Sequence, residues 1–122
     1  MSNNRRKELV LYGIKNCDSC RKAQSWIQSH QAAFTFVDFR EHGLPEKRLK
    51  KWLDSELGPK LLNRRSTTWR NLGEAERGAA EKDPLPLLLA NPTLIKRPLV
   101  TAGGELLAVG FSPADFEKLI QD

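Results

Sequence analysis

Residues 8–39 change from a strand pattern to a helix pattern and back, and this alternation restricts the fold more than any other feature. The run "ELVLYG" (8–13) is apolar and ends in glycine, which is typical of a buried strand. Residues 18–30 repeat apolar side chains at helical spacing and so predict a helix with one buried face. The run "AFTFVDF" (33–39) is rich in β-branched and aromatic residues, which predicts a second strand. Together these segments predict a right-handed parallel strand–helix–strand unit.

The rest of the chain divides into a helical stretch and a second strand region. Residues 44–94 carry helical periodicity at 46–57 and a short helix opened by "DPLPLLLAN", and they contain no strand signal. In "RPLVTAGGELLAVG" (97–110), a pair of glycines joins two apolar runs, which predicts a β-hairpin. The stretch "SPADFEKLIQ" (112–121) predicts a final helix with Ser112 as its N-cap.

This order of elements predicts an α/β protein with a thioredoxin-like core, made of a β-α-β unit, a β-hairpin and a helix. Residues 8–43 and 95–122 would form that core, and 44–94 would form a helical insertion between the second and third strands. We expect a single domain over 1–122, because a chain of this length can bury one core without crosslinks or metals.

Composition and charge argue against several classes of partner. The net charge is +5, but the basic residues are scattered, and the densest group (45–53) alternates with apolar residues as on the solvated side of an amphipathic helix. We therefore expect no direct contact with nucleic acid. The longest apolar run is far shorter than the roughly 20 residues of a membrane helix, and no signal-peptide segment follows the first residues. We expect a monomer in the cytoplasm that contacts no membrane.

Two cysteines in "YGIKNCDSCRKAQSWI" (12–27) stand where the first strand passes into the first helix. Cys17 falls at the helix start, where unpaired N–H groups and the helix dipole stabilise a thiolate. Lys15 and the neighbouring basic residues act in the same direction, so we expect a lowered pKa and a nucleophilic Cys17. Cys20 would lie on the same helical face within about 5 to 6 Å, close enough to resolve a mixed disulfide.

Other interpretations of the cysteine pair remain open at this point. A zinc site needs four ligands, whereas the chain has only two cysteines and two histidines without ligand spacing, so we predict no metal. Cys20 could instead be a small buried residue, because free cysteine is among the most buried residue types. An inert Cys17 is less favoured, since a helix start is an unusual place to bury a thiol.

Three ordered motifs, "LYGIKNCDSCRKAQSWI", "LLNRRSTTWRNL" and "NPTLIKRPLV", resemble the arsenate reductase-related (ArsC/Spx) family, and most closely its YffB branch. The resemblance spans roughly residues 8–120 and implies a thioredoxin-like core with a helical insertion. It also implies that Cys17 is the redox nucleophile, that Arg97 lies close to its thiol, and that Pro98 follows a cis peptide bond. Arg65 is similar to a basic residue of the family's central loop.

The arginines suggest an anion-binding site around the thiol. Arg97 precedes a strand expected beside the first one, so its guanidinium could hold a thiolate or an oxyanion, although a plain surface role is the alternative. Arg65 would supply a second contact, and Arg64 competes for that role. Lys15 and Pro98 complete the predicted substrate-binding set. Of the neighbouring residues, Ser66, Thr67 and Thr68 could bind an anion or cap a helix turn, and Trp69 is better explained as core.

The favoured function is that of a thiol-disulfide oxidoreductase with Cys17, Cys20 and Arg97 as catalytic residues. It would have no bound cofactor and would use glutathione as co-substrate, acting on a disulfide or an oxyanion. The alternative is a redox sensor that resembles Spx and binds a protein partner such as RNA polymerase. The family's arsenate reductases carry a histidine before the nucleophile and an arginine after the hairpin. Here "GIKN" and "AVGFSP" have neither, which weighs against arsenate as the substrate.

Overall fold

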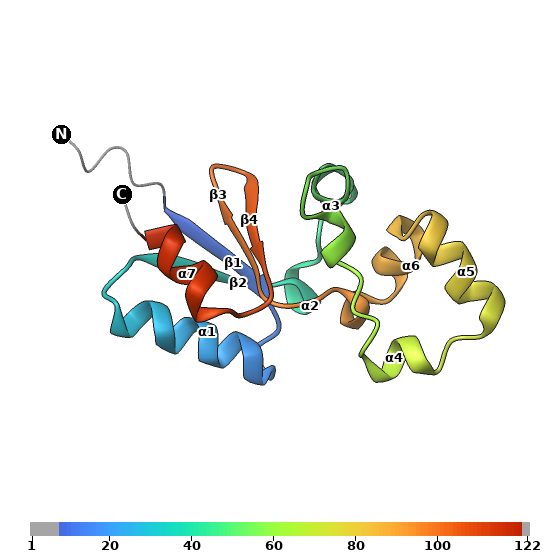
Figure 1. Ribbon diagram of the computed structural model, residues 1–122, viewed down its shortest axis with the longest axis horizontal. Coiled ribbons are helices and arrows are strands. Elements are labelled where there is room, and N and C mark those ends of the chain that lie inside the picture. The colour runs from blue at the N-terminus through green and yellow to red at the C-terminus, as the bar shows by residue number, and fades with distance from the viewer. Residues whose placement is uncertain (1–7, 121–122) are drawn as a thin grey trace. The chain divides into compact units, whose positions relative to one another are not determined.

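The computed structural model describes residues 8–120 and divides into two compact units (Figure 1). One unit contains the residues up to Gly43 and those from Arg97 onward, and the other is Leu44–Lys96. The elements of the first unit are β1 (Leu9–Gly13), α1 (Asp18–Ser29), β2 (Phe34–Asp38), α2 (Phe39–His42), β3 (Leu99–Ala102), β4 (Glu105–Val109) and α7 (Pro113–Ile120). Those of the second are α3 (Glu46–Leu53), α4 (Thr67–Arg70), α5 (Glu74–Lys82) and α6 (Leu85–Ala90), with the 3₁₀ turns η2 (Gly58–Lys60) and η3 (Pro92–Leu94).

A four-stranded mixed sheet in the order β2-β1-β3-β4 forms the centre of the first unit. Strands β1 and β2 are parallel, whereas β3 runs antiparallel to both β1 and β4. The hairpin turn uses Gly103 and Gly104, whose φ angles of 60° and 86° lie in the left-handed region that glycine adopts without steric cost. The predicted thioredoxin-like α/β fold, with a helical segment between β2 and β3, is confirmed.

The core of this unit lies where α1 and α7 pack against the sheet. Its buried residues come from all but one of the strands and from both helices: Leu9, Leu11, Ala23, Ile27, Val100, Ala102, Ala108 and Phe116. Trp26 of α1 meets Phe116 of α7 edge to face, with ring centroids 5.8 Å apart. Ser112 caps α7 as predicted, because its Oγ accepts a hydrogen bond from the Asp115 N–H at 3.4 Å. The packing fixes α1 against β1, and α1 carries both cysteines.

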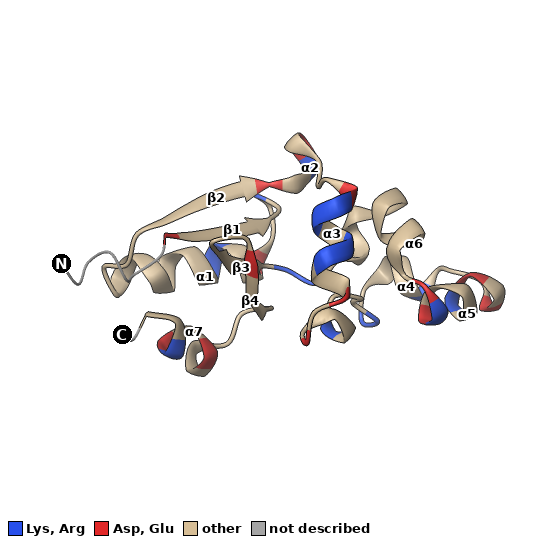
Figure 2. Ribbon diagram, turned by 90° about the horizontal axis from the view of Figure 1, so that it is seen from above, with Lys and Arg blue, Asp and Glu red and all other residues tan. Residues whose placement is uncertain are grey.

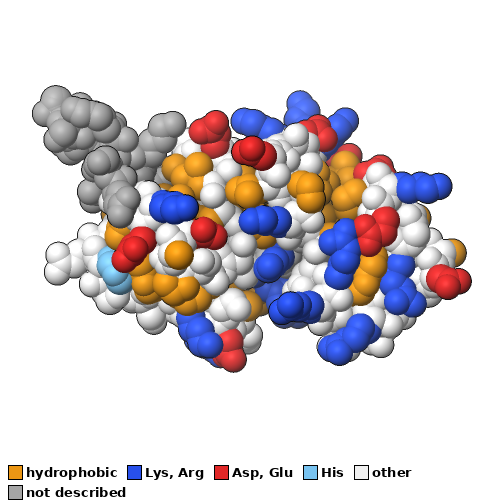
Figure 3. Space-filling model, in the orientation of Figure 1, with side chains coloured by type: hydrophobic (Ala, Val, Ile, Leu, Met, Phe, Trp, Pro, Cys, Tyr) orange, Lys and Arg blue, Asp and Glu red, His pale blue; other side chains and the backbone are white. Residues whose placement is uncertain are grey.

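The second unit consists of short helices and 3₁₀ turns joined by loops, and Leu62 and Ile95 form an isolated β-bridge within it. In α3, Leu49 and Trp52 are buried, while the lysines and arginines that colour most of this helix in Figure 2 are exposed. The basic stretch is therefore the solvated side of an amphipathic helix, as predicted. On the face drawn in Figure 3, hydrophobic side chains show between charged side chains of both signs.

Three segments differ from the sequence predictions. The strand predicted to reach residue 39 ends at Asp38, because the Asp38 side chain caps α2 and turns the backbone into a helix. The helix predicted over 46–57 ends at Leu53 and gives way to turns before Gly58. The polar stretch 73–83 has no apolar periodicity that predicts a helix, yet it contains α5, whose first turn is closed by the Glu76 carboxylate accepting from the Gly73 N–H at 3.2 Å.

The length and apolar character of the helices determine whether any of them could cross a membrane. Within residues 8–120, no helix has both the length and the apolar character that a membrane span requires.

Candidate active site

Cys17 is the N-cap residue of α1. Its backbone is extended, with φ −119° and ψ 124°, and its carbonyl accepts the first helical hydrogen bond, from the Arg21 N–H at 3.0 Å. The side chain is half-buried, so the sulfur remains open to a reactant while part of its hydration is removed. The structure thus places this cysteine where the sequence predicted, at the positive end of a twelve-residue helix.

The surroundings of Cys17 favour its ionised form. Burial has the largest single effect and by itself would raise the pKa of the Cys17 thiol, but a hydrogen bond from Arg97 opposes it. The backbone N–H and the thiol of Cys20 add to this effect, as does the positive charge of Arg97, and the net result is a lowered pKa. Arg97 is therefore the cation that acts on this sulfur. Arg21, which the sequence also placed near it, instead pairs with Asp18.

Cys20 has the opposite environment. It is fully buried in the first turn of α1, and burial, together with the negative charge of Cys17, raises the pKa of Cys20 to about 12. The Ile14 N–H partly offsets this by interacting with the sulfur. Gly13 lies directly against the Cys20 sulfur, so that a side chain at position 13 would collide with it. Cys20 is thus a buried core residue, which is one of the interpretations that the sequence left open, and it is also a hydrogen-bond partner of Cys17. Its role as a resolving thiol stays a prediction.

Arg97 reaches the thiol from the segment that leads into β3. The Arg97–Pro98 peptide bond is cis, as the family resemblance implied. Directly after it, Leu99 of β3 pairs with Tyr12 of β1, so the arginine is delivered beside the strand that leads to Cys17. Arg97 as a whole residue is half-buried. Residues far apart in the sequence meet here because β3 lies next to β1.

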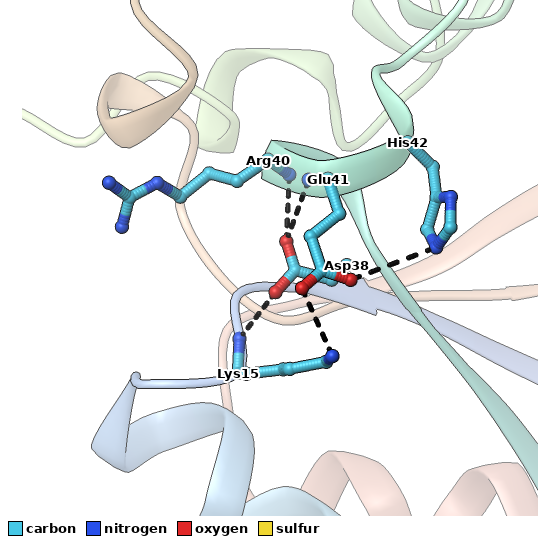
Figure 4. Close-up of polar contacts among 5 residues, drawn as sticks. All are labelled: Lys15, Asp38, Arg40, Glu41 and His42. Atoms are coloured by element: carbon cyan, nitrogen blue, oxygen red, sulfur yellow. Dashed lines mark hydrogen bonds and ion pairs between the residues drawn. The ribbon is translucent and has the colours of Figure 1, made fainter.

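Lys15 lies in the loop between β1 and α1, two residues before Cys17. Its ammonium pairs with Glu41 at 3.0 Å and its side chain is 64% exposed. The Lys15 backbone N–H donates to the Asp38 carboxylate at 2.9 Å (Figure 4). Sequence reasoning missed Asp38. The available signal was an N-cap residue type at the end of a strand predicted to pair with the strand before the cysteines.

The two arginines of the central motif belong to the second unit. Arg64 makes a bidentate ion pair with Glu81, at 2.7 Å from Nε and 2.5 Å from the terminal nitrogen, and its guanidinium lies 6.0 Å from the centre of the Trp69 ring. The side chain of Arg65 is exposed, and its backbone N–H donates to Asn63 at 3.0 Å. A substrate contact by either arginine stays a prediction.

The neighbouring residues of this motif have structural roles. The Ser66 Oγ accepts from the Trp69 N–H at 3.1 Å and so caps α4, which is one of the two roles predicted for this segment. Trp69 itself is buried, as predicted.

The two histidines contact other side chains of the first unit. His30 stacks on Trp26, with ring centroids 3.7 Å apart, and His42 lies 3.9 Å from Glu41. Over the part of the chain that the structure describes, no group of three or more His, Cys, Asp and Glu side chains could hold a metal ion.

The fold and the site define a class: a thioredoxin-like protein with a CxxC pair at the start of its first helix. Comparison with known proteins narrows this class. A model of the ArsC family matches residues 12–119, and the chain belongs to that family. The structure of the YFFB (PA3664) protein is similar, with a TM-score of 0.83 and 37% identity over 93% of this chain and 99% of the other. The predicted resemblance to this family, and to YffB within it, is confirmed.

Two further relatives show the range of the family. An arsenate reductase (ArsC) related protein from Brucella melitensis has a TM-score of 0.74 and 38% identity, covering 91% of this chain and 92% of the other. The regulatory protein MgsR of Bacillus subtilis is 29% identical over 120 residues, which is 93% of this chain and 90% of MgsR.

Proposed function

We propose that the protein is a thiol-disulfide oxidoreductase that reduces mixed disulfides between glutathione and other thiols. The observation that carries this proposal is the environment of Cys17, a half-buried thiol at a helix start whose pKa is lowered, despite burial, by a hydrogen bond from Arg97. A thiolate at neutral pH is the reactive form in thiol-disulfide exchange, whereas an ordinary cysteine is mostly protonated there.

The first half of the reaction needs only Cys17 and the substrate. The Cys17 thiolate attacks the glutathione sulfur of a mixed disulfide, the S–S bond breaks, and the other thiol leaves as a thiolate that takes up a proton from solvent. Cys17 is then joined to glutathione by a new disulfide. Arg97 would hold the attacking thiolate in place and offer positive charge to a glutathione carboxylate, and Lys15 would add a second contact by exchanging its exposed partner Glu41 for the substrate.

Glutathione is better suited than Cys20 to the second half. A second glutathione thiolate attacks the bound glutathione sulfur, releases oxidised glutathione and restores the Cys17 thiolate. Cys20 could instead attack Cys17, which would release glutathione and leave a Cys17–Cys20 disulfide. Burial, the largest cause of its raised pKa, also applies in the Cys17–glutathione disulfide and keeps Cys20 protonated, so this route starts from a smaller thiolate population.

The roles of the other predicted residues follow from their contacts. Pro98 fixes the chain direction between Arg97 and β3. In the second unit, Arg64 is held by its bidentate pair with Glu81, whereas the side chain of Arg65 is exposed, and a contact of either arginine with an anionic substrate stays a prediction. Glutathione is abundant in the cytoplasm, which is where we expect the protein to act.

The test is turnover of a glutathionylated peptide in the presence of glutathione, glutathione reductase and NADPH, followed as NADPH consumption. Cys17→Ser should abolish turnover, and Cys20→Ser should retain most of it. Full activity in Cys17→Ser would refute the proposal. Loss of activity in Cys20→Ser, together with a Cys17–Cys20 disulfide in the mass spectrum of mildly oxidised wild type, would show that Cys20 resolves the intermediate.

A second candidate function is redox-controlled binding of a protein partner, and similarity to the regulatory protein MgsR favours it specifically. A Cys17–Cys20 disulfide would remove the Cys17 charge beside Arg97 and so change the surface at the start of α1. Oxidised and reduced protein, with Cys17→Ser as the control, can be compared for binding to purified RNA polymerase. Redox-dependent binding without turnover would favour this function, and equal binding in both states would exclude it for this partner.

A further inference from the structure

The Asp38 carboxylate joins three backbone N–H groups from two segments of the first unit. Its Oδ1 accepts from the N–H groups of Arg40 at 2.8 Å and Glu41 at 3.2 Å, which caps α2. Its Oδ2 accepts from the Lys15 N–H at 2.9 Å, in the loop that leads to Cys17. Figure 4 shows the carboxylate between that loop and the start of α2. Thus Oδ1 caps α2, while Oδ2 binds the loop that leads to Cys17.

Burial and the pairing of β2 with β1 fix the position of the Asp38 carboxylate. Asp38 is only 5% exposed, and it pairs with Gly13 in the parallel register between β1 and β2. Burial by itself would raise the pKa of Asp38, but the hydrogen bonds from Lys15, Arg40 and Glu41 lower it, so the group stays ionised at neutral pH. A buried, ionised carboxylate accepts stronger hydrogen bonds than a neutral group does.

Two consecutive backbone N–H groups, of Ile14 and Lys15, attach the loop between β1 and α1 to its surroundings. The Ile14 N–H interacts with the buried Cys20 sulfur, and the next one, of Lys15, donates to Asp38. Cys17 follows two residues later, and its pKa depends on the distance of its sulfur from Arg97 and from the first turn of α1. Movement of the loop would change those distances.

We propose that Asp38 is a positioning residue for Cys17, which acts by anchoring the Lys15 N–H and thereby holds the cysteine loop against α1 and Arg97. The surface ion pair between Lys15 and Glu41 joins the same two segments, but its side chains are 64% and 50% exposed, so it is expected to add little. The other charged groups around the carboxylate point elsewhere, since Arg40 extends away from it and His42 faces Glu41 (Figure 4).

The substitution Asp38→Asn separates the two roles of this side chain, which are to cap α2 and to accept from the Lys15 N–H. In Asp38→Asn, the side-chain oxygen can still cap α2, but an amide NH₂ now faces the Lys15 N–H, so that two donors meet and the loop loses its acceptor. Glu41→Gln is the matched control, because it removes the surface ion pair and leaves the Asp38 hydrogen bonds in place. The assay is the rate of Cys17 alkylation by iodoacetamide against pH, in a Cys20→Ser background so that only one thiol reacts.

We expect the inflection of the alkylation profile to rise by about half a pKa unit or more in Asp38→Asn, which is roughly a threefold loss of rate at pH values below it. In Glu41→Gln, the inflection should stay within about 0.2 unit of the parent. A profile of Asp38→Asn that coincides with the parent would overturn the proposal. An equal shift in Glu41→Gln would also do so, because the ion pair would then account for the effect.

Hydrogen exchange in the unmodified protein supplies a test that needs no variant, should Asp38→Asn fail to fold. The Lys15 amide should exchange at least about a hundredfold more slowly than an unprotected amide. Exchange at the unprotected rate would show that the anchor is absent and would overturn the proposal. The inference rests on Cys17 as the reactive thiol of the proposed function, yet alkylation needs no substrate. If the protein has no reductase activity, the alkylation assay can still show whether Asp38 positions Cys17.

Discussion

Replacing Arg97 by methionine should raise the pKa of Cys17 and slow its reactions at neutral pH. A hydrogen bond to a charged group contributes about 1.5 to 3 kcal/mol, and the low end applies here because the half-buried Cys17 is partly screened by water. Since about 1.4 kcal/mol corresponds to one pKa unit, we expect a rise of roughly one unit. Below the inflection, the thiolate fraction should fall by about tenfold.

The assay is iodoacetamide alkylation between pH 4 and pH 10, which brackets the roughly 3.5 to 8.5 range of cysteine pKa values. Arg21→Met is the matched control, because Arg21 lies one helical turn from Cys17 but pairs with Asp18. Its profile should match that of the wild type. A profile of Arg97→Met that also matches would refute the assignment of the lowered pKa to Arg97. Equal shifts in both variants would show that general positive charge, and not the Arg97 hydrogen bond, lowers the pKa.

Four further predictions concern stability. Gly13→Ala should destabilise the protein by about 1 to 3 kcal/mol in urea denaturation, because the new methyl group would meet the Cys20 sulfur. Gly78→Ala in α5, where nothing lies within 4 Å of the new atom, should instead stabilise by about 0.5 to 1 kcal/mol, and a loss there would contradict the argument. The raised pKa of Cys20 contributes stability that is complete below the unfolded value of about 8.5 and is lost as pH rises through about 12. Wild type should therefore lose more stability than Cys20→Ser between pH 7 and alkaline pH, and parallel losses would be the contrary result. Glu81→Gln should lower the thermal midpoint slightly at low salt and not at high salt, since the Arg64 pair is half exposed, and a salt-independent loss would count against a simple ion pair.

Much of the candidate site could be predicted because its signals are local. The apolar run before Cys17 and the helical spacing after it place the thiol at a helix start, whatever the rest of the chain does. The glycine pair at 103 and 104 specifies the hairpin for the same reason, since the turn conformation is a property of those residues themselves. The cis bond at Pro98 was anticipated only through the resemblance to the family, whereas Arg97 was also indicated by its position before a strand expected beside the first one.

Other features had no local signal. The polar stretch around α5 lacks apolar periodicity, so its helix depended on the Gly73–Glu76 cap and on packing within the second unit. The role of Asp38 depends on the register between β1 and β2, which sets its carboxylate opposite the cysteine loop. A single aspartate after a strand does not reveal that register.

The sequence by itself determined the order of strands and helices, the hairpin turn and the position of Cys17 at the start of α1. These follow from spacing and residue type among neighbours along the chain. The tertiary structure alone decided that Cys20 is fully buried, that Arg97 contacts the Cys17 thiol, and that Asp38 anchors the preceding loop. The physical reason is that burial and electrostatic environment depend on which distant segments meet, and here the placement of β1 between β2 and β3 brings those segments together.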